Sequence, residues 1–251
     1  MVVFVRLTVL GACGAWPEPG QACSGYLVEH DGFRLLIDAG YATMPRLLER
    51  MAASDLDAVF ISHGHPDHCA DLNPLLRARA MGDAPAPPLP VYALPGALDA
   101  VLALDVPGML AGAFTLHELT PGSLLGIGPF DALTSLLPHW VPNVGLRLSA
   151  AGAVLAYTGD CGPDPAMARL ARDADLLLAE ATFPGTVPSG SQGFLSSAAQ
   201  AGACAAQAGA AHLALTHLWP GTSRDAARTA AAAEYDGLIS VAAPGLSLEL
   251  R

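Results

Sequence analysis

Four side chains that can bind a metal ion lie within six residues of this chain, in the string ISHGHPDH. They are His63, His65, Asp67 and His68. Neutral imidazole and carboxylate are the ligands that zinc and similar divalent ions accept. The spacing lets His63 and His65 reach one ion, while Asp67 and His68, where a helix is expected to begin, reach a second ion. The alternative, a solvated loop, would gather these histidines by chance.

Three further residues of the same chemical types follow apolar runs that read as strands. Asp160 follows residues 153–157 in AYTGD, His217 follows 213–215 in LALTHLWP, and His139 lies in LLPHWVPNVG. Strand ends that face one edge of a sheet converge in space, and a carboxylate such as Asp160 can bridge two cations. Alone, His139 or His217 is as often a hydrogen-bonded core residue. In this order, together with the first string, they predict a metal site.

The whole pattern resembles a known family. The order HxHxDH, lone His, TGD-type Asp and late His is similar to the ligand pattern of the metallo-β-lactamase-fold hydrolases. The strings LTVLGACGAWP, SGYLVEHDGFRLLIDAG, LLLAEATF and LTHLWPGTSR resemble the short ribonuclease Z-like branch. Within that branch, the chain is most similar to bacterial proteins described as cyclic-nucleotide-degrading phosphodiesterases. The resemblance runs from about residue 4 to the C-terminus.

The resemblance implies a dinuclear metal centre. One ion is held by His63, His65 and His139, the second by Asp67, His68 and His217, and Asp160 bridges them. Zn²⁺ is the expected ion, and Mn²⁺ or Fe²⁺ suits the same ligands. Asp67 is also expected to orient the nucleophile. Glu180, in the EAT string, is expected beside the centre, where it supports the ligands or handles a proton.

The chain departs from the branch at one position. Phe194, in the string GFLS, stands where the branch usually has a His that helps with the phosphate or the leaving group. The residue that gives a proton to the leaving group is therefore not identified, and Phe194 becomes a candidate for substrate binding. Arg224, in GTSR, is a second candidate, for a contact to phosphate or nucleobase, although an Arg at a helix start is more often a surface charge.

Composition bounds the class of protein. With 251 residues, 52% hydrophobic and 14% charged, the chain is expected to form one packed α/β domain over residues 1–251. We find no apolar stretch suited to a membrane span, and MVVFVRLTVLG reads as a first strand rather than a signal peptide, so a cytoplasmic protein is expected. Five scattered cysteines without a CxxC pair predict buried thiols, not a disulfide framework.

The charge of the chain argues against a large nucleic acid as partner. The net charge is −11, the 12 basic residues are all arginines, and none form a basic run. Affinity for tRNA or DNA depends on many Lys and Arg contacts to phosphates. The basic Gly/Pro-rich arm with which true ribonuclease Z grips tRNA is also not evident. A small phosphodiester still fits, since bound metal ions supply local positive charge.

Hydrophobic periodicity predicts alternating strands and helices in two similar halves. The strands expected are residues 2–10, 24–30, 33–38, 57–62, 91–93, 113–119, 128–137, 144–149, 153–158, 175–179 and 212–216. The helices expected are residues 44–53, 96–105, 164–172, 196–208 and 223–235, with one more after the metal-binding string. This order fits a four-layer αββα sandwich with the site at one edge between the sheets. Residues 184–194 read as a loop that borders the pocket or is an ordinary surface connection.

The predicted reaction is hydrolysis of a phosphodiester by a hydroxide that two bound cations generate from water. The alternative among enzymes is carbonyl chemistry on the same centre, by a lactonase, thioesterase or β-lactamase-like amide hydrolase. A third hypothesis is a metal-binding or sensing protein that lost catalysis together with the usual His, but all seven expected ligands are intact. Because the family is often dimeric and the stretch SSAAQAGACAAQAGAA has small side chains, a homodimer is expected.

Overall fold

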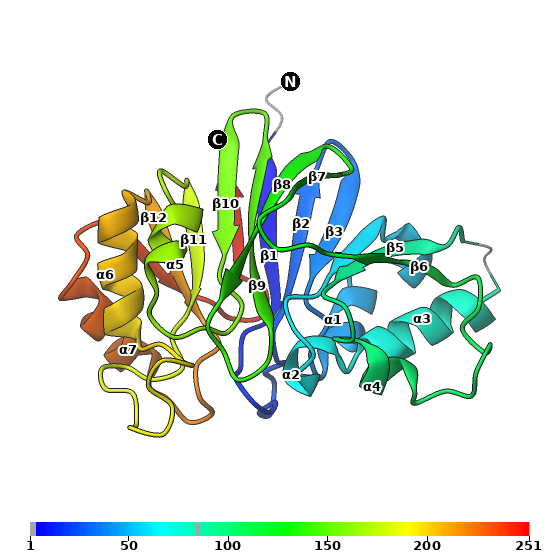
Figure 1. Ribbon diagram of the computed structural model, residues 1–251, viewed down its shortest axis with the longest axis horizontal. Helices are drawn as coiled ribbons and strands as arrows, with labels where there is room; N and C mark the ends of the chain where they lie inside the picture. The colour runs from blue at the N-terminus through cyan, green and yellow to red at the C-terminus, as the bar shows by residue number, and fades with distance from the viewer. Residues whose placement is uncertain (1–3, 84–85, 251) are drawn as a thin grey trace.

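Two seven-stranded sheets lie face to face in the computed structural model, which describes residues 4–83 and 86–250 (Figure 1). In sheet order, the first contains β14 (Ser247–Leu250), β1 (Val5–Gly11), β2 (Gly25–His30), β3 (Phe33–Ile37), β4 (Ala58–Phe60), β5 (Leu89–Ala93) and β6 (Phe114–Glu118). The second contains β13 (Leu238–Val241), β12 (His212–Thr216), β11 (Leu176–Glu180), β10 (Ala153–Tyr157), β9 (Asn143–Ala150), β8 (Phe130–Leu137) and β7 (Leu124–Ile127).

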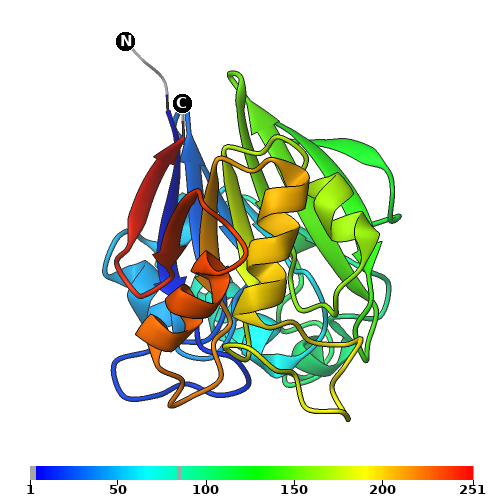
Figure 2. The same ribbon diagram turned by 90° about the vertical axis from the view of Figure 1, so that its left-hand side faces the viewer.

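Helices cover the outer face of each sheet (Figures 1 and 2). The first sheet carries α1 (Thr43–Leu48), α2 (Pro66–Cys69), α3 (Leu72–Met81) and α4 (Asp99–Leu102), with a 3₁₀ turn at Ala53–Asp55. The second carries α5 (Pro165–Leu170), α6 (Ala198–Ala208) and α7 (Arg224–Ala232). The predicted four-layer αββα sandwich is thus confirmed. In the part of the chain that the structure describes, no helix is both long and apolar enough to cross a bilayer.

The core between the sheets connects directly to the edge where the metal-binding residues gather. The buried rings of Tyr26 and Tyr157 lie 5.2 Å apart between the two sheets. The hydroxyl of Tyr26 lies 2.6 Å from Oγ1 of Thr216, and the hydroxyl of Tyr157 donates to the carboxylate of Asp38 at 2.7 Å. Both tyrosines therefore join apolar packing to polar groups at the ends of strands.

Several predicted boundaries were wrong, and three strands were not predicted. The helix expected at 44–53 ends at Leu48, and the one expected at 96–105 covers only Asp99–Leu102, after Gly96 with φ of 75°. The strands β7, β13 and β14 were not predicted. They are short strands at the edges of the sheets, and for β14 the pairing is also long-range, with Val5↔Leu250 in β1. Residues 2 and 3 of the first predicted strand lie outside the described residues.

All five cysteines are buried and free, as predicted. Burial raises the pKa of each thiol, which keeps them protonated; the five are Cys13, Cys23, Cys69, Cys161 and Cys204. Cys69 and Cys161 directly follow expected metal ligands in the chain. Their protonated state makes them small packing residues beside the site rather than nucleophiles.

Candidate metal centre

The expected ligands all lie just beyond the C-terminal ends of strands. His63, His65, Asp67 and His68 follow β4, His139 follows β8, Asp160 follows β10 and His217 follows β12. The strands β10, β11 and β12 are parallel, so the residues after them emerge at one edge of the second sheet. The structure brings all seven side chains together as two groups of four that share Asp160.

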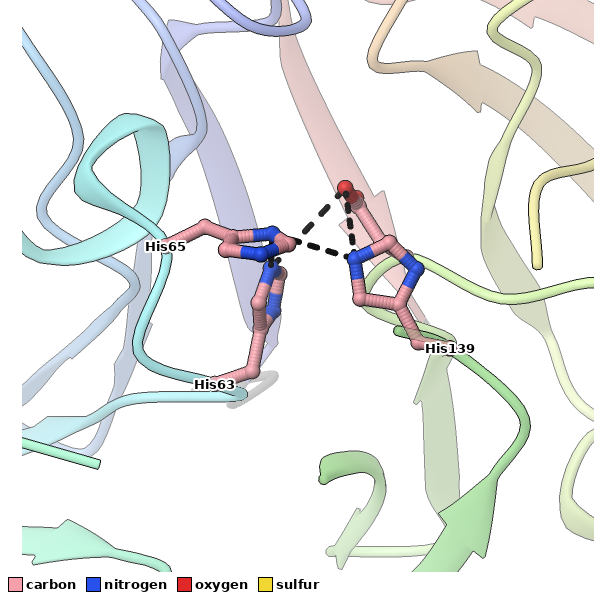
Figure 3. Close-up of side chains that lie close together, drawn as sticks. His63, His65 and His139 are labelled. Atoms are coloured by element: carbon pink, nitrogen blue, oxygen red, sulfur yellow. Dashed lines mark hydrogen bonds and ion pairs between the residues drawn. The ribbon is translucent and has the colours of Figure 1, made fainter. Parts of the chain in front are cut away.

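The first group consists of His63, His65, His139 and Asp160. Nδ1 of His65 lies 3.1 Å from Nε2 of His63 and 3.1 Å from Nε2 of His139. Oδ2 of Asp160 lies 3.9 Å from Nε2 of His63 and from Nε2 of His139. The three imidazoles come from two loops and point toward one another (Figure 3). Four ligand atoms within 4.8 Å of one another can surround one ion.

The second group consists of Asp67, His68, His217 and the same Asp160. Nε2 of His217 lies 3.1 Å from Oδ2 of Asp67 and 3.2 Å from Oδ2 of Asp160. Nε2 of His68 lies 3.2 Å from Oδ1 of Asp160. Asp160 therefore directs one oxygen at His68 and the other at His217 and the first group. A carboxylate placed in this way can hold two cations.

Hydrogen bonds at the far side of four imidazoles fix which nitrogen faces the centre. In each ring Nδ1 donates, at 2.7–3.0 Å: His63 to Oγ of Ser62, His68 to Oδ2 of Asp38, His139 to the carbonyl oxygen of Phe194, and His217 to Oγ1 of Thr182. A proton on Nδ1 leaves the lone pair on Nε2, which is the atom that faces the centre in each case. The rings are therefore preset as metal ligands.

Two buried atoms of the centre lack a hydrogen-bond partner among the described residues. They are Nε2 of His68 and Oδ1 of Asp160, both directed at the space between the ligands. An unpaired buried polar atom costs free energy, and a cation bound between the two atoms removes that cost. Five imidazoles and two carboxylates are also the donor set that divalent ions of the zinc type accept. The residues present fit a pair of such ions.

Electrostatics in the centre also favour cations. Burial lowers the pKa of His63, His65 and His139, so these rings are neutral at neutral pH, as ligation requires. Burial opposes ionisation of Asp160, but His217 and His68 outweigh it and hold the pKa of that carboxyl well below its usual value. For His68, burial is outweighed by Asp160 and Asp67, which raise its pKa. The field that favours a proton on Nε2 of His68 favours a metal ion there too.

Asp38 is a residue in contact with the cluster that the sequence analysis missed. This fully buried carboxylate accepts from the backbone N–H of Ser62 at 2.7 Å, Oγ of Ser62 at 2.8 Å and Nδ1 of His68 at 2.7 Å. Because Oγ of Ser62 accepts in turn from His63, Asp38 orients one imidazole in each group. The available signal was its position: Asp38 ends the run LLID directly after β3, as the ligands end theirs.

The carboxylate of Glu180 contacts neighbours of the expected ligands rather than the ligands themselves. Its buried carboxylate accepts from the backbone N–H of Cys161 at 2.5 Å, Oγ1 of Thr182 at 2.5 Å and the N–H of Ser196 at 3.1 Å. Through Cys161 it holds the backbone next to Asp160, and through Thr182 it holds the ring of His217. Burial, and then Asp160, raise its pKa to about 8. These contacts favour support of the ligands over the handling of a proton.

Asp67 and Phe194 both lie at the centre, whereas Arg224 is engaged elsewhere. Oδ2 of Asp67 accepts from the N–H of Ala15 at 2.7 Å, which orients the carboxylate. Phe194 presents its carbonyl oxygen to His139 and a half-exposed ring to solvent. The guanidinium of Arg224 instead donates to the carbonyl oxygens of Val241 at 3.0 Å and of Ala242, beside β13. The structure thus does not join Arg224 to the ligand cluster.

Comparisons with known proteins agree with this fold and site. The model of the beta-lactamase superfamily domain matches residues 33–218. The probable metallo-hydrolase YhfI of Bacillus subtilis is 31% identical over 98% of this chain and 100% of its own length. Its crystal structure aligns with a TM-score of 0.90 over 98% of this chain and 99% of that chain. The chain therefore belongs to the β-lactamase superfamily and is a hydrolase of the metallo-β-lactamase fold.

Ribonuclease Z proteins are among the relatives. The ribonuclease Z of Mycobacterium marinum is 28% identical over 94% of this chain and 95% of its length. The short form of human tRNase Z shares the fold, with a TM-score of 0.77 at 22% identity over 98% of this chain and 99% of that chain. The predicted resemblance to the ribonuclease Z-like branch is confirmed by these matches.

Proposed function

We propose that this protein is a dinuclear metal-dependent phosphodiesterase that acts on a small phosphodiester such as a cyclic nucleotide. The observation that carries the proposal is the sharing of Asp160 by two groups of ligands, since a bridging carboxylate holds two cations close together. Such a pair, when bound, supplies charge that stabilises phosphoryl transfer and lowers the pKa of a water nucleophile. The names of the ribonuclease Z relatives support phosphodiester chemistry.

The residues of the chain prepare the site for this chemistry. Asp160 and Asp67 bring two negative charges into a largely buried cluster, which balances part of the charge of two divalent ions. Asp67, fixed by the N–H of Ala15, is the carboxylate that we propose to orient the attacking water. Asp38 and Thr182 keep His68 and His217 in the required tautomer, so the ligands need no rearrangement during the reaction.

A small substrate is supported over RNA by the charge of the chain. The net charge is −11, and the 12 basic residues are all arginines that form no basic run, so few contacts to successive phosphates can form. A single phosphodiester needs only the two ions as counter-charge. We propose zinc as the ion, because imidazole-rich sets with two carboxylates suit it, with Mn²⁺ or Fe²⁺ as alternatives. The homodimer stays a prediction, which light scattering on the purified protein tests.

The proposal is tested by assaying protein of measured metal content with bis-p-nitrophenyl phosphate and 3′,5′-cyclic AMP. The wild type is expected to hydrolyse both, and His65→Ala is expected to lose at least about a hundredfold in rate, because one ligand of the first ion is gone. His117→Ala, which removes a histidine on β6, is the matched control and keeps wild-type rates. No turnover with two ions bound, together with hydrolysis of a lactone or thioester, overturns the proposal.

A further inference from the structure

Two pairs of exposed aromatic side chains lie beside the metal centre. Trp140 and Phe194 are 50% and 38% exposed and stack with centroids 5.5 Å apart and planes 25° from parallel. Trp16 and Trp219 meet edge to face, at 5.0 Å and 81°. Large aromatic surfaces left in water at the rim of a site are typical of ligand contacts.

Both members of the Trp140–Phe194 pair contact His139, an expected ligand of the first ion. Trp140 is the residue after His139, and the two rings lie 5.1 Å apart. The carbonyl oxygen of Phe194 accepts from Nδ1 of His139 at 2.8 Å. The pair is thus held at a fixed place next to the first group of ligands.

The loops that carry Trp140 and Phe194 both contact Gly162, which lies two residues after Asp160. The N–H of Gly162 donates to the carbonyl oxygen of Pro138 at 2.9 Å, which anchors the loop of Trp140. A Cβ at Gly162 would lie 2.1 Å from the carbonyl carbon of Gly193 and 2.6 Å from the nitrogen of Phe194, so the second loop packs directly on Gly162. An aromatic surface held this firmly loses little entropy when it binds a ligand.

The chemistry of the pair selects a flat ring as its ligand. A third ring can continue a stack of two nearly parallel rings, whereas the perpendicular Trp16–Trp219 pair offers no common plane, and one face of Trp219 already stacks on Phe183 at 6.0 Å and 18°. Stacking needs only the flat π face of a ring and no charged side chain of the protein. Every nucleobase offers such a face.

We propose that Trp140 and Phe194 form a platform on which the nucleobase of a nucleotide phosphodiester stacks while its phosphate lies at the metal centre. The proposal rests on the proposed function, and it makes this pair the determinant of preference for nucleotides over phosphodiesters without a base.

The test compares 3′,5′-cyclic AMP with the methyl riboside 3′,5′-cyclic phosphate, in which methoxy replaces the base. The wild type is expected to favour cyclic AMP in KM by about tenfold, the order of one stacked base. Trp140→Leu and Phe194→Leu bring the two KM values together, and Trp140→Phe keeps most of the preference. Trp16→Leu changes a comparably exposed Trp, next to Ala15, which contacts Asp67 of the second group, and it leaves the preference at its wild-type value. Equal effects of Trp140→Leu on both substrates, or a selective effect of Trp16→Leu instead, overturn the proposal.

Binding separates this proposal from the proposed function. The probe is the hydrolysis-resistant phosphorothioate analogue of cyclic AMP, titrated calorimetrically into zinc-loaded protein. If the wild type does not hydrolyse cyclic AMP but binds the analogue, and Trp140→Leu weakens the Kd by about tenfold, the platform stands and the phosphodiesterase proposal fails. If the wild type does not bind the analogue, or Trp140→Leu binds it equally well, the platform is overturned.

Discussion

His68 donates a 2.7 Å hydrogen bond to Asp38, and both side chains are fully buried. The same carboxylate accepts from Ser62, which in turn accepts from His63, so one residue orients an imidazole in each of the two ligand groups. The hydroxyl of Tyr157 donates to it as well, at 2.7 Å. Asp38 is therefore the point at which the core between the sheets determines the geometry of the metal centre.

Asp38→Asn is expected to weaken binding of both metal ions by about 10- to 100-fold, the effect typical of losing a carboxylate partner of a metal-ligating His. The new amide places N–H groups against the donors of His68 and Tyr157. Competition with a chromophoric chelator measures the affinities. Asp71→Asn is the control, because the carboxylate of Asp71 accepts from the N–H of Met44 and contacts no expected ligand. Equal affinities for wild type and Asp38→Asn would contradict the assignment.

Thr182→Val is expected to weaken only the second ion. The hydroxyl of Thr182 accepts from Nδ1 of His217 at 2.9 Å and donates to Glu180, while no ligand of the first group contacts it. Titration with zinc should show one affinity retained and one reduced by about tenfold or more. The control is Thr134→Val, which changes a different buried threonine, on β8, and leaves both affinities unchanged. A uniform loss at both ions would show that Thr182 acts on general stability.

Glu180 predicts a pH dependence of stability in protein stripped of metal. Burial and Asp160 raise its pKa from an ordinary value of 4.5 to about 8. Between these values the folded protein keeps a proton that the unfolded chain releases, so the stabilisation is full below the lower value and is lost as pH rises to the upper one. Glutamine has no such proton. The difference in unfolding free energy between wild type and Glu180→Gln should therefore fall as pH rises.

Urea unfolding of both proteins at about pH 5.5 and about pH 8.5 measures this difference. Because every other titrating group is common to the two proteins, the difference isolates Glu180. A difference that stays constant or grows with pH would mean that Glu180 is ionised in the metal-free fold.

Gly162→Ala is expected to disturb the first ion and to cost about 1–3 kcal/mol of stability, as overpacking does. Its Cβ would lie 2.1 Å from the carbonyl carbon of Gly193, so the loop that holds His139 through Phe194 must move. Gly185→Ala, in the same loop with open space around the position, is the control. Thermal unfolding and zinc titration measure the two effects. Unchanged zinc affinity in a folded Gly162→Ala protein would contradict the link between this loop and His139.

The gathering of the seven side chains could be predicted from their order along the chain, since His139 or His217 alone carries no such signal. His63 and His217 are chemically distinctive and end apolar runs, and the parallel order of the strands then converts position in the chain into proximity. Asp160 was placed as the bridge through the family resemblance, and its carboxylate lies close to both groups: Oδ1 faces His68, and Oδ2 faces His217 and the first group. The sandwich could likewise be predicted, since its strands have strong apolar patterns.

The groups that support the ligands could not be predicted in the same way. Asp38 looks like an ordinary residue after a hairpin until the fold brings it to His68, which is 30 positions away. Thr182 has no sequence signal beyond its place after the EAT string. Arg224 has a family-like context, yet its guanidinium donates to the carbonyl oxygens of Val241, the last residue of β13, and of Ala242. The strand β13 was itself not predicted, because only four of its residues pair.

The dependence of cyclic AMP hydrolysis on the number of zinc ions per chain tests the central claim most directly. Metal-free protein is titrated with zinc, and the rate and the bound metal are measured on the same samples. The shared Asp160 predicts that activity appears as the second ion binds and reaches its maximum at two ions per chain. Full activity at one ion, or no hydrolysis at two, would contradict a dinuclear phosphodiesterase.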